Sequence, residues 1–291
     1  MTAATAARSA SRPVPPSRLR RHLALLGLLV VIAWAALGID VDLEKLVRLP
    51  GGVLLIVHRM FVDPGLDFTY LETALIGMLQ SIEIAWVGTV IAAILSLPIG
   101  FVAAKNVSSG PISNAIRVLL DAIRAFPELV LAVAIFIPIA GLGPVAGALA
   151  IGIHSIGTLG KLTAEVIEGI DAGPVEAARS VGGSTLQVHR WAVLPQVLPE
   201  IVAFWLYRFE INIRGAAVLG VVGAGGIGFL LQQTVVYGRF GKAGMALVVV
   251  IVATILVDTV SGWVRRRIIE GGGTRRAIEA ELEQPELVEG I

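Results

Sequence analysis

Several apolar stretches of about 20 residues constrain the fold of this chain more than any other feature of its sequence. A helix needs about that many apolar residues to cross the hydrocarbon core of a membrane, where a spanning segment must satisfy its own backbone polar groups. The composition agrees, because 56% of the 291 residues are hydrophobic and 15% are charged. We therefore predict an all-α integral membrane protein with about six transmembrane helices.

Turn residues and polar interruptions divide the apolar sequence into six predicted spans. They cover residues 23–39, 81–104, 117–140, 145–167, 199–222 and 243–263. Ala33-Trp34-Ala35 resembles a signal-peptide cleavage site, but the long charged region before it and the helices after it favour a retained first helix. Residues 53–57 are apolar but too short to cross a membrane, so they predict an interfacial helix in an outer loop.

The distribution of Lys and Arg predicts the orientation of the chain in the membrane. If both ends lie in the cytoplasm, the inner segments hold 14 of these residues and the outer segments hold 5. We therefore expect a multi-pass membrane protein with both termini cytoplasmic. The predicted organisation is a disordered basic tail at 1–21, a transmembrane domain at 22–269 and an acidic cytoplasmic tail at 270–291.

Several functional classes are disfavoured by the residues that the chain contains. The net charge of +1 gives no indication of nucleic-acid binding, and no cysteine is present. The four histidines form no metal-ligand motif, and no GxxxxGK[ST] phosphate loop occurs. Residues 223–228 partly match GxGxxG, but no strand precedes them, so a dinucleotide site is not expected.

The polar segment of residues 170–196 carries the strongest local signals. Pro174 predicts a helix start, and Glu176 suits the first turn, where the helix dipole favours a negative charge. Gly182 can take the positive φ that ends such a helix, and Ser184 predicts the cap of a second short helix. The segment should fold as a helix–turn–helix at the cytoplasmic face, with a shape that suits a groove on a soluble partner.

The motif in this loop resembles the EAA loop of ABC importer permeases. Glu-Ala-Ala at 176–178 is followed by Gly182, and a Leu-Pro pair ends at residue 195, thirteen positions further on. Ala192 departs from the family, which usually has isoleucine there. The resemblance implies that this loop, residues 173–191, is the coupling helix that sits in a cleft of an ATPase subunit. The residues to which it gives this ATPase-coupling role are Glu176, Ala177, Ala178 and Gly182.

The resemblance covers residues 70–267 and narrows to the phosphonate (PhnE-like) permease family through residues 124–129, 154–162 and 207–228. It implies a type I ABC importer (MetI-like) permease fold in a bacterial plasma (inner) membrane, a homodimer, two ABC ATPase subunits and an extracytoplasmic substrate-binding protein. ATP and Mg would be bound by the ATPase, so this chain is expected to hold no cofactor, metal or catalytic residue. The implied cargo is a phosphonate, or alternatively phosphate or phosphite.

Charged and amide side chains within the predicted spans need a reason, because a charge in lipid costs about 3 kcal/mol on insertion scales. The candidates for a translocation path in the fifth and third spans are Arg208, Glu210, Asn212, Arg214, Arg124 and Glu128. They could line a translocation path, with arginine binding the oxyanion through planar, charge-assisted hydrogen bonds. They could instead neutralise each other in pairs four residues apart, Glu210 with Arg214 and Arg124 with Glu128, and lock the bundle. Pro127, between Arg124 and Glu128, predicts a kink in the third span.

Other polar positions have simpler interpretations. Lys161 and Glu165 predict a structural pair, and His154 predicts a hydrogen bond between helices. The glycines of the outer loop, Gly223, Gly225 and Gly226, form either a turn or a flexible gate. Arg239 and Lys242 follow them in what we interpret as a solvated outer loop.

Two rival functions remain from the sequence alone. A secondary transporter or channel would explain the charges in the spans, but it would not explain the EAA-like loop, and no clear inverted repeat is present. A membrane-bound enzyme would need clustered His, Asp or Ser, which the sequence does not offer.

Overall fold

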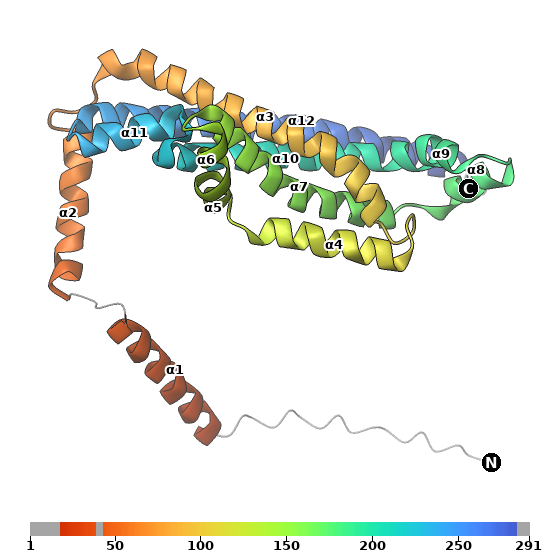
Figure 1. The fold of residues 1–291 in the computed structure, drawn as a ribbon, viewed down its shortest axis with the longest axis horizontal. Coiled ribbons are helices and arrows are strands. Elements are labelled where there is room, and N and C mark those ends of the chain that lie inside the picture. Colours follow the sequence, from red (N-terminus) through yellow and green to blue (C-terminus); the bar gives the residue numbers. More distant parts are fainter. Residues whose placement is uncertain (1–17, 39–42, 284–291) are drawn as a thin grey trace, which may run out of the picture. The chain divides into compact units, whose positions relative to one another are not determined.

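The computed structural model describes residues 18–38 and 43–283, and every secondary-structure element that it describes there is helical (Figure 1). The chain divides into two units, residues 1–56 and 57–291. The all-α class predicted from the apolar stretches is confirmed.

The first unit contains α1 (Arg18–Gly38) and the beginning of α2 (Leu43–Phe61). α1 contains an apolar window, Arg21–Gly38, with a mean hydropathy of 1.9, so the first predicted span is a helix of sufficient length. α2 is longer than the short helix predicted over residues 53–57. Residues 1–17 of the predicted basic tail lie outside the described residues, and the remaining four belong to α1.

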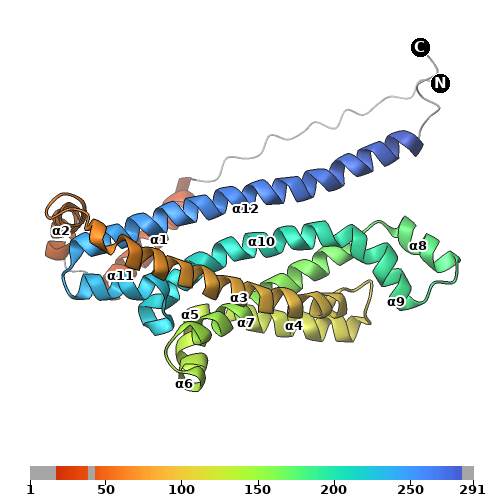
Figure 2. The ribbon, with the colours of Figure 1, turned by 90° about the horizontal axis from the view of Figure 1, so that it is seen from above.

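The second unit is a set of long helices joined by short helical turns (Figures 1 and 2). Its α-helices are α3 (Leu71–Ala103), α4 (Gly110–Ala125), α5 (Glu128–Leu131), α6 (Ile137–Ala140), α7 (Pro144–Glu168), α8 (Ala172–Ser180), α9 (Thr185–Val188), α10 (Leu194–Leu219), α11 (Gly226–Val236) and α12 (Phe240–Glu283). A 3₁₀ turn, Phe68–Tyr70, precedes α3. Three π-helical segments, Ala132–Phe136, His189–Val193 and Gly220–Ala224, lie beside α5, α9 and α10.

The number of membrane spans agrees with the prediction. Four described helices are long and apolar enough to cross a membrane, and the number is six when two bent helix pairs each count as one span. The second span starts at Leu71 rather than at residue 81, because Glu72 and Gln80 interrupt the apolar sequence but not the helix. α11 was missed, since residues 226–236 were assigned to an outer loop. α11 is bent by 56° relative to the helix before it.

The third span bends by 83° between α4 and α5, which confirms the kink predicted at Pro127. Phe126 has an extended backbone with ψ of 121°, because the ring of the following proline disfavours the helical conformation. α5 then starts at Glu128. We call residues 126–127 the elbow.

α3 and α7 pack closely because small residues line their contact (Figure 2). An added Cβ at Gly88 of α3 would lie 2.9 Å from the carbonyl oxygen of Ala148 and 2.8 Å from Cγ2 of Ile151, both on α7. An added Cβ at Gly152 would likewise lie 3.3 Å from the carbonyl oxygen of Gly88. Close backbone approach through small residues is the usual way for helices to associate in lipid, where water provides no hydrophobic driving force between them.

α12 extends beyond the predicted sixth span. Its candidate span, Phe240–Ile268, contains an 18-residue window with a mean hydropathy of 2.4, and the helix continues to Glu283. The predicted acidic tail therefore begins as a continuation of α12, and residues 284–291 lie outside the described residues. The boundaries of the two tails and of the transmembrane domain stay predictions.

Gly88→Ala should lower the unfolding free energy by about 2 kcal/mol, because the Ala148 carbonyl against which the new methyl group packs is part of the α7 backbone. Thermal unfolding of the purified protein in detergent measures this change. Gly262→Ala in α12 is the matched control: its Cβ meets no atom closer than Arg266 Nη1, at 3.9 Å, so no loss is expected. Equal stability of both variants would contradict the α3–α7 contact.

Candidate functional site

The polar loop forms the helix–turn–helix that its sequence predicts. α8 starts two residues before Pro174, because Asp171 caps it by accepting a hydrogen bond of 2.9 Å from the Gly173 N–H. Pro174 therefore lies inside the first turn, where its missing N–H removes no helical bond. Gly182 follows α8 with a φ of +80°, which is the left-handed conformation predicted for it.

The second short helix is fixed by a capping box. Ser184 Oγ accepts a hydrogen bond from the Gln187 N–H, and Gln187 Oε1 accepts one from the Ser184 N–H at 2.8 Å. The predicted cap at Ser184 is therefore confirmed. A π-helical turn, His189–Val193, then continues directly into α10, so the loop and α10 form one connected helical path.

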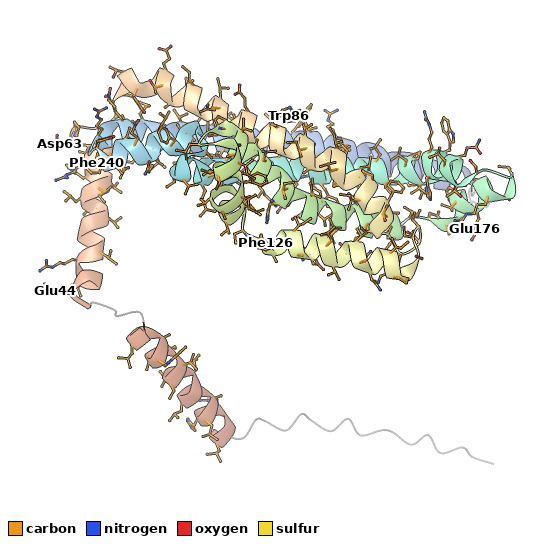
Figure 3. The ribbon with its side chains drawn as sticks, viewed as in Figure 1. Glu44, Asp63, Trp86, Phe126, Glu176 and Phe240 are labelled. Carbon is orange, nitrogen blue, oxygen red and sulfur yellow. The ribbon has the colours of Figure 1, made fainter. Side chains whose placement is uncertain are left out.

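The loop presents a mixed apolar and acidic surface at one end of the second unit, where Glu176 lies (Figure 3). Glu176 and Ala177 are exposed, and Ala178 is half-buried. Close by in the chain, the side chains of Val181, Leu186 and Trp191 are 85%, 77% and 71% exposed. Exposed large apolar side chains beside a carboxylate suit contact with another protein.

A continuous chain of buried hydrogen bonds joins α10, α7 and α3. Arg208 Nε donates to Ser155 Oγ at 2.9 Å, and Ser155 Oγ donates to Asn212 Oδ1 at 3.2 Å. Asn212 Nδ2 donates to Thr89 Oγ1 at 2.8 Å, and Thr89 Oγ1 donates to the Ala85 carbonyl at 2.6 Å. Asn212 is fully buried, so these bonds satisfy an amide that has no access to water. We call this series the Arg208–Thr89 chain.

Glu210 and Arg214 do not pair with each other, so that prediction is wrong. Arg214 Nη2 donates to both carboxylate oxygens of Asp258 on α12, at 3.0 and 2.9 Å. Glu210 is 7% exposed, and its ion-pair partner is Arg265 of α12, with 3.8 Å between Oε1 and Nη1. Glu210 Oε1 accepts no hydrogen bond from the described part of the chain. Both charges on α10 thus find partners on α12 instead of along their own helix.

The predicted pair of Arg124 and Glu128 is also wrong, because the elbow bends the backbone between them. Arg124 Nη2 donates to Asp121 Oδ1 at 3.3 Å. Lys161 Nζ donates to the same oxygen at 2.9 Å, so the predicted pair of Lys161 with Glu165 is not formed. One carboxylate of α4 therefore binds two cations, and this cluster joins α4 to α7.

Glu128 lies against α10, on the far side of the elbow. An added Cβ at Gly215 would come within 2.5 Å of Glu128 Oε1, so the absence of a side chain there makes room for the carboxylate. The carboxylate interacts electrostatically with Arg208 and with His154. His154 Nδ1 lies 3.0 Å from the Phe126 carbonyl oxygen, so this histidine bonds to the extended elbow between α4 and α5 and not, as predicted, to another helix.

The six predicted path residues therefore divide into two groups. Those that lie together around the Arg208–Thr89 chain are Arg208, Asn212 and Glu128. Those that bind elsewhere are Arg124, Glu210 and Arg214. Ser155 and Thr89 were not predicted to belong to the site. A small hydroxyl residue in an apolar helix is nevertheless a recognisable signal of a polar contact between helices.

The glycine-rich segment makes the sharp turn from α10 into α11. Gly223, Gly225 and Gly226 have φ values of +94°, +80° and +72°, which residues with a side chain rarely adopt. The first N–H groups of α11 are satisfied by α3: Gln80 Oε1 accepts from the Gly226 N–H at 2.7 Å and Ser81 Oγ accepts from the Ile227 N–H at 2.9 Å. The turn is thus confirmed, and a gating role stays a prediction.

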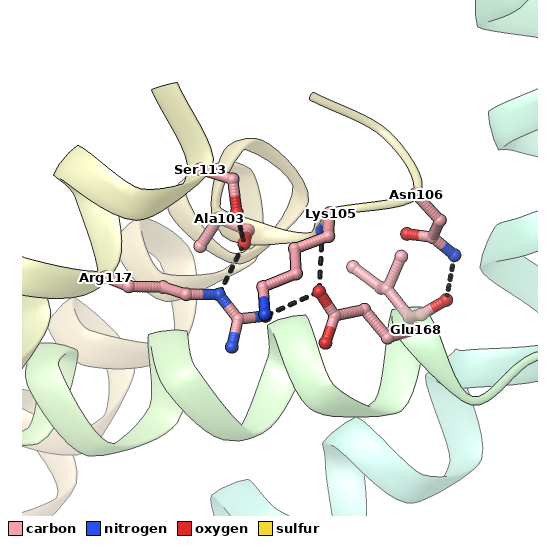
Figure 4. Close-up of polar contacts among 7 residues, drawn as sticks. Ala103, Lys105, Asn106, Ser113, Arg117 and Glu168 are labelled. Carbon is pink, nitrogen blue, oxygen red and sulfur yellow. Dashed lines mark hydrogen bonds and ion pairs between the residues drawn. The ribbon is translucent and has the colours of Figure 1, made fainter. Parts of the chain in front are cut away.

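A second polar cluster closes the end of α7 nearest the loop (Figure 4). Glu168 Oε1 accepts from Arg117 Nη2 and from the Lys105 backbone N–H, both at 2.6 Å. Arg117 Nε and Ser113 Oγ also donate to the Ala103 carbonyl, at 2.9 and 2.7 Å. These bonds hold the connection between α3 and α4 against α7, beside the start of the loop.

A basic pocket of about 630 Å³ lies at the other end of the second unit. Its cationic side chains, Arg59, Arg239 and Lys242, each lie over an aromatic ring at 5.4 to 5.9 Å. Asp67 lines the same pocket, and its hydrogen bond from the Thr69 hydroxyl lowers the pKa of the Asp67 carboxyl. The carboxylate is therefore ionised at neutral pH and balances part of the positive charge.

The long apolar helices, the polar interior and the projecting loop together define a class, the polytopic membrane protein. Residues 96–270 match the family model of the binding-protein-dependent transport system inner membrane component. This match covers more than half of the sequence, so the chain belongs to that family. Membership makes it a multi-pass inner-membrane transport protein rather than an enzyme, and it disfavours the secondary transporter and channel alternatives.

Individual relatives agree with the family. The chain is 44% identical over 191 residues to the phosphate-import permease protein PhnE of Mycolicibacterium smegmatis, covering 65% of this chain and 36% of that protein. It therefore spans about a third of that relative's length. It is 40% identical over 201 residues to the phosphite transport system permease protein PtxC of Stutzerimonas stutzeri, covering 69% and 73%.

A solved structure of the MetNI methionine ABC transporter, in an inward-facing conformation, is similar in fold. The TM-score is 0.63 at 19% identity, and the match covers 70% of this chain and 99% of that one. The MetI-like permease fold implied by the sequence resemblance is thereby confirmed.

Asn212→Leu should lower the unfolding free energy by about 2 kcal/mol, because it leaves Ser155 and Thr89 without their buried partner. Thermal unfolding in detergent measures the loss. Asn114→Leu on α4 is the control, since Asn114 is exposed and the same change should have little effect there. A stable Asn212→Leu protein would show that the Arg208–Thr89 chain contributes little to the fold.

Proposed function

We propose that the chain is the transmembrane permease subunit of an ATP-driven ABC importer for phosphonates or the related oxyanions phosphite and phosphate. The observation that carries the substrate class is the environment of Arg208, which is 8% exposed within the bundle. Its Nε donates a hydrogen bond to Ser155, and among the described residues both Nη groups are left free. A planar guanidinium binds tetrahedral oxyanions through parallel, charge-assisted hydrogen bonds. Two relatives, named for phosphate import and phosphite transport, support this class.

The translocation path would run along the face of α10 that carries Arg208 and Asn212, past Glu128. Glu210 and Arg214 lie on the face of α10 toward α12, and Arg124 lies on α4. We propose that these three act at the margin of the path, where their ion pairs neutralise charges that would otherwise face lipid. Gly223, Gly225 and Gly226 would form a gate at the outer end, since their positive φ values give the backbone there conformations that other residues rarely adopt.

The assembly that we propose is a homodimer of this chain with two ABC ATPase subunits, an extracytoplasmic binding protein and surrounding membrane lipid, and without nucleic acid. ATP and Mg would be bound by the ATPases and not by this chain. Both termini would be cytoplasmic, which puts the α8–α9 loop on the same side as the ATPases. Glu176, Ala177, Ala178 and Gly182 would form the contact through which ATP-driven closure reaches α10.

Uptake into proteoliposomes that contain the complete complex tests the substrate. Labelled phosphate competes there with methylphosphonate, aminoethylphosphonate and phosphite in the presence of ATP. We expect ATP-dependent uptake with one of these oxyanions preferred, and Arg208→Gln should lower it by about tenfold or more, because a buried charge contact to the cargo is lost. Preferred phosphate uptake would assign phosphate as the cargo. Uptake that continues without ATP would contradict the importer function.

Glu176→Gln should lower uptake several-fold and should weaken the stimulation of ATP hydrolysis by the loaded binding protein, because the exposed carboxylate of the loop is removed from the ATPase contact. Both rates are measured in the same proteoliposomes. Glu165→Gln, an exposed carboxylate on α7, is the matched control and should leave both rates unchanged. Equal rates for all three proteins would remove Glu176 from the coupling contact.

A further inference from the structure

Arg208 has an unsatisfied positive charge in the interior of the second unit. Among the described residues, neither of its Nη nitrogens has a hydrogen-bond partner. Both nitrogens are accessible to solvent in the single chain. Its Nε bond to Ser155 fixes the guanidinium plane but supplies no negative charge. A cation at this depth needs an anion nearby, because lipid and packed helices solvate it poorly.

Glu128 is positioned to be that anion. It interacts electrostatically with Arg208, but the two side chains form no ion pair at contact distance. The Glu128 carboxylate lies against Gly215, seven residues along α10 from Arg208 and on the same face of that helix. In the part of the chain that the structure describes, Glu128 accepts no hydrogen bond. Two opposite charges therefore face the same region without binding each other directly.

Glu128 lies between two irregular backbone segments, at which a small change in backbone angles would shift its carboxylate. It is the first residue of α5, directly after the 83° elbow, and a π-helical turn follows four residues later. The Phe126 carbonyl at the elbow is held by His154, which also interacts with Glu128 and Arg208. The charged groups that face Glu128 thus come from α7 and α10, whereas the backbone that carries it belongs to a separate short helix.

We propose that Glu128 is an internal counter-anion that occupies the neighbourhood of Arg208 in the empty permease and is displaced by the entering oxyanion. This inference rests on the proposed function, since it assumes that Arg208 meets the cargo. Glu128 makes Arg208 selective: an anion must compete with a tethered carboxylate, so a tetrahedral dianion with two oxygens for the guanidinium fork binds in preference to a weak monoanion. Chloride therefore does not occupy the path at rest.

Binding of inorganic phosphate to the permease–ATPase complex, without binding protein, tests the displacement. A scintillation proximity assay with labelled phosphate, on the complex in nanodiscs, gives the phosphate concentration at half-saturation. Glu128→Gln removes the competing charge but keeps the shape of the side chain, so we expect this concentration to fall about tenfold. Glu128→Asp retains the charge, so its half-saturating phosphate concentration should lie closer to that of the unaltered protein than that of Glu128→Gln does. Glu83→Gln, the same change at an exposed position of α3, is the control and should also bind like the unaltered protein.

The combined variant Glu128→Gln, Arg208→Gln separates this role from a structural one. Its phosphate binding should fall below that of the unaltered complex, because the gain from Glu128→Gln acts through Arg208. Thermal unfolding without phosphate verifies that each variant is folded. Unchanged or weaker phosphate binding by a folded Glu128→Gln protein would overturn the inference.

Uptake by Arg208→Gln in the complete complex distinguishes failure of the counter-anion role of Glu128 from failure of the proposed path. Loss of uptake together with unchanged phosphate binding by Glu128→Gln would overturn the counter-anion and leave the proposed path intact. Normal uptake by Arg208→Gln would overturn both, since the cargo would then not meet this arginine.

Discussion

The close contact between α3 and α7 is the constraint on which the rest of the second unit depends. Glycine at 88 and 152 lets the two backbones approach, and this approach carries Thr89 and Ser155 to either side of Asn212 on α10. A larger residue at the contact would separate these hydroxyl groups from the amide. The polar interior is therefore a consequence of helix spacing, and helix spacing is a consequence of the smallest side chains.

The charges within the spans show how much a neighbouring helix can change an expectation based on spacing. Residues four apart share a face of a helix, which predicted three intrahelical pairs. Partners on another helix are Asp258 for Arg214, Arg265 for Glu210 and Asp121 for Lys161. Arg124 instead binds Asp121, three residues away on its own helix, because the elbow separates it from Glu128. Spacing along one helix says which side chains can meet, but it cannot say which partner a second helix brings closer.

The sequence predicted most of the fold because apolar length and local capping are properties of single segments. The six spans, the elbow at Pro127, the cap at Ser184 and the turn at Gly182 follow from residues near in the chain. α11 was missed because its first N–H groups are satisfied by Gln80, far away in the sequence. Of the predicted path, Arg208, Asn212 and Glu128 lie together, whereas the residues that join them depend on tertiary packing.

The π-helical turn at His189–Val193 lies directly before α10 and continues into it. A π-turn is an α-helical turn that has accepted one additional residue, so this turn holds surplus length within a continuous helical path. Loss of one residue inside the turn restores α geometry and leaves the faces of α10 as they are. Loss of one residue within α10 itself rotates everything beyond it by about 100°. Tolerance of single-residue deletions during evolution should therefore be greater in this turn than in α10.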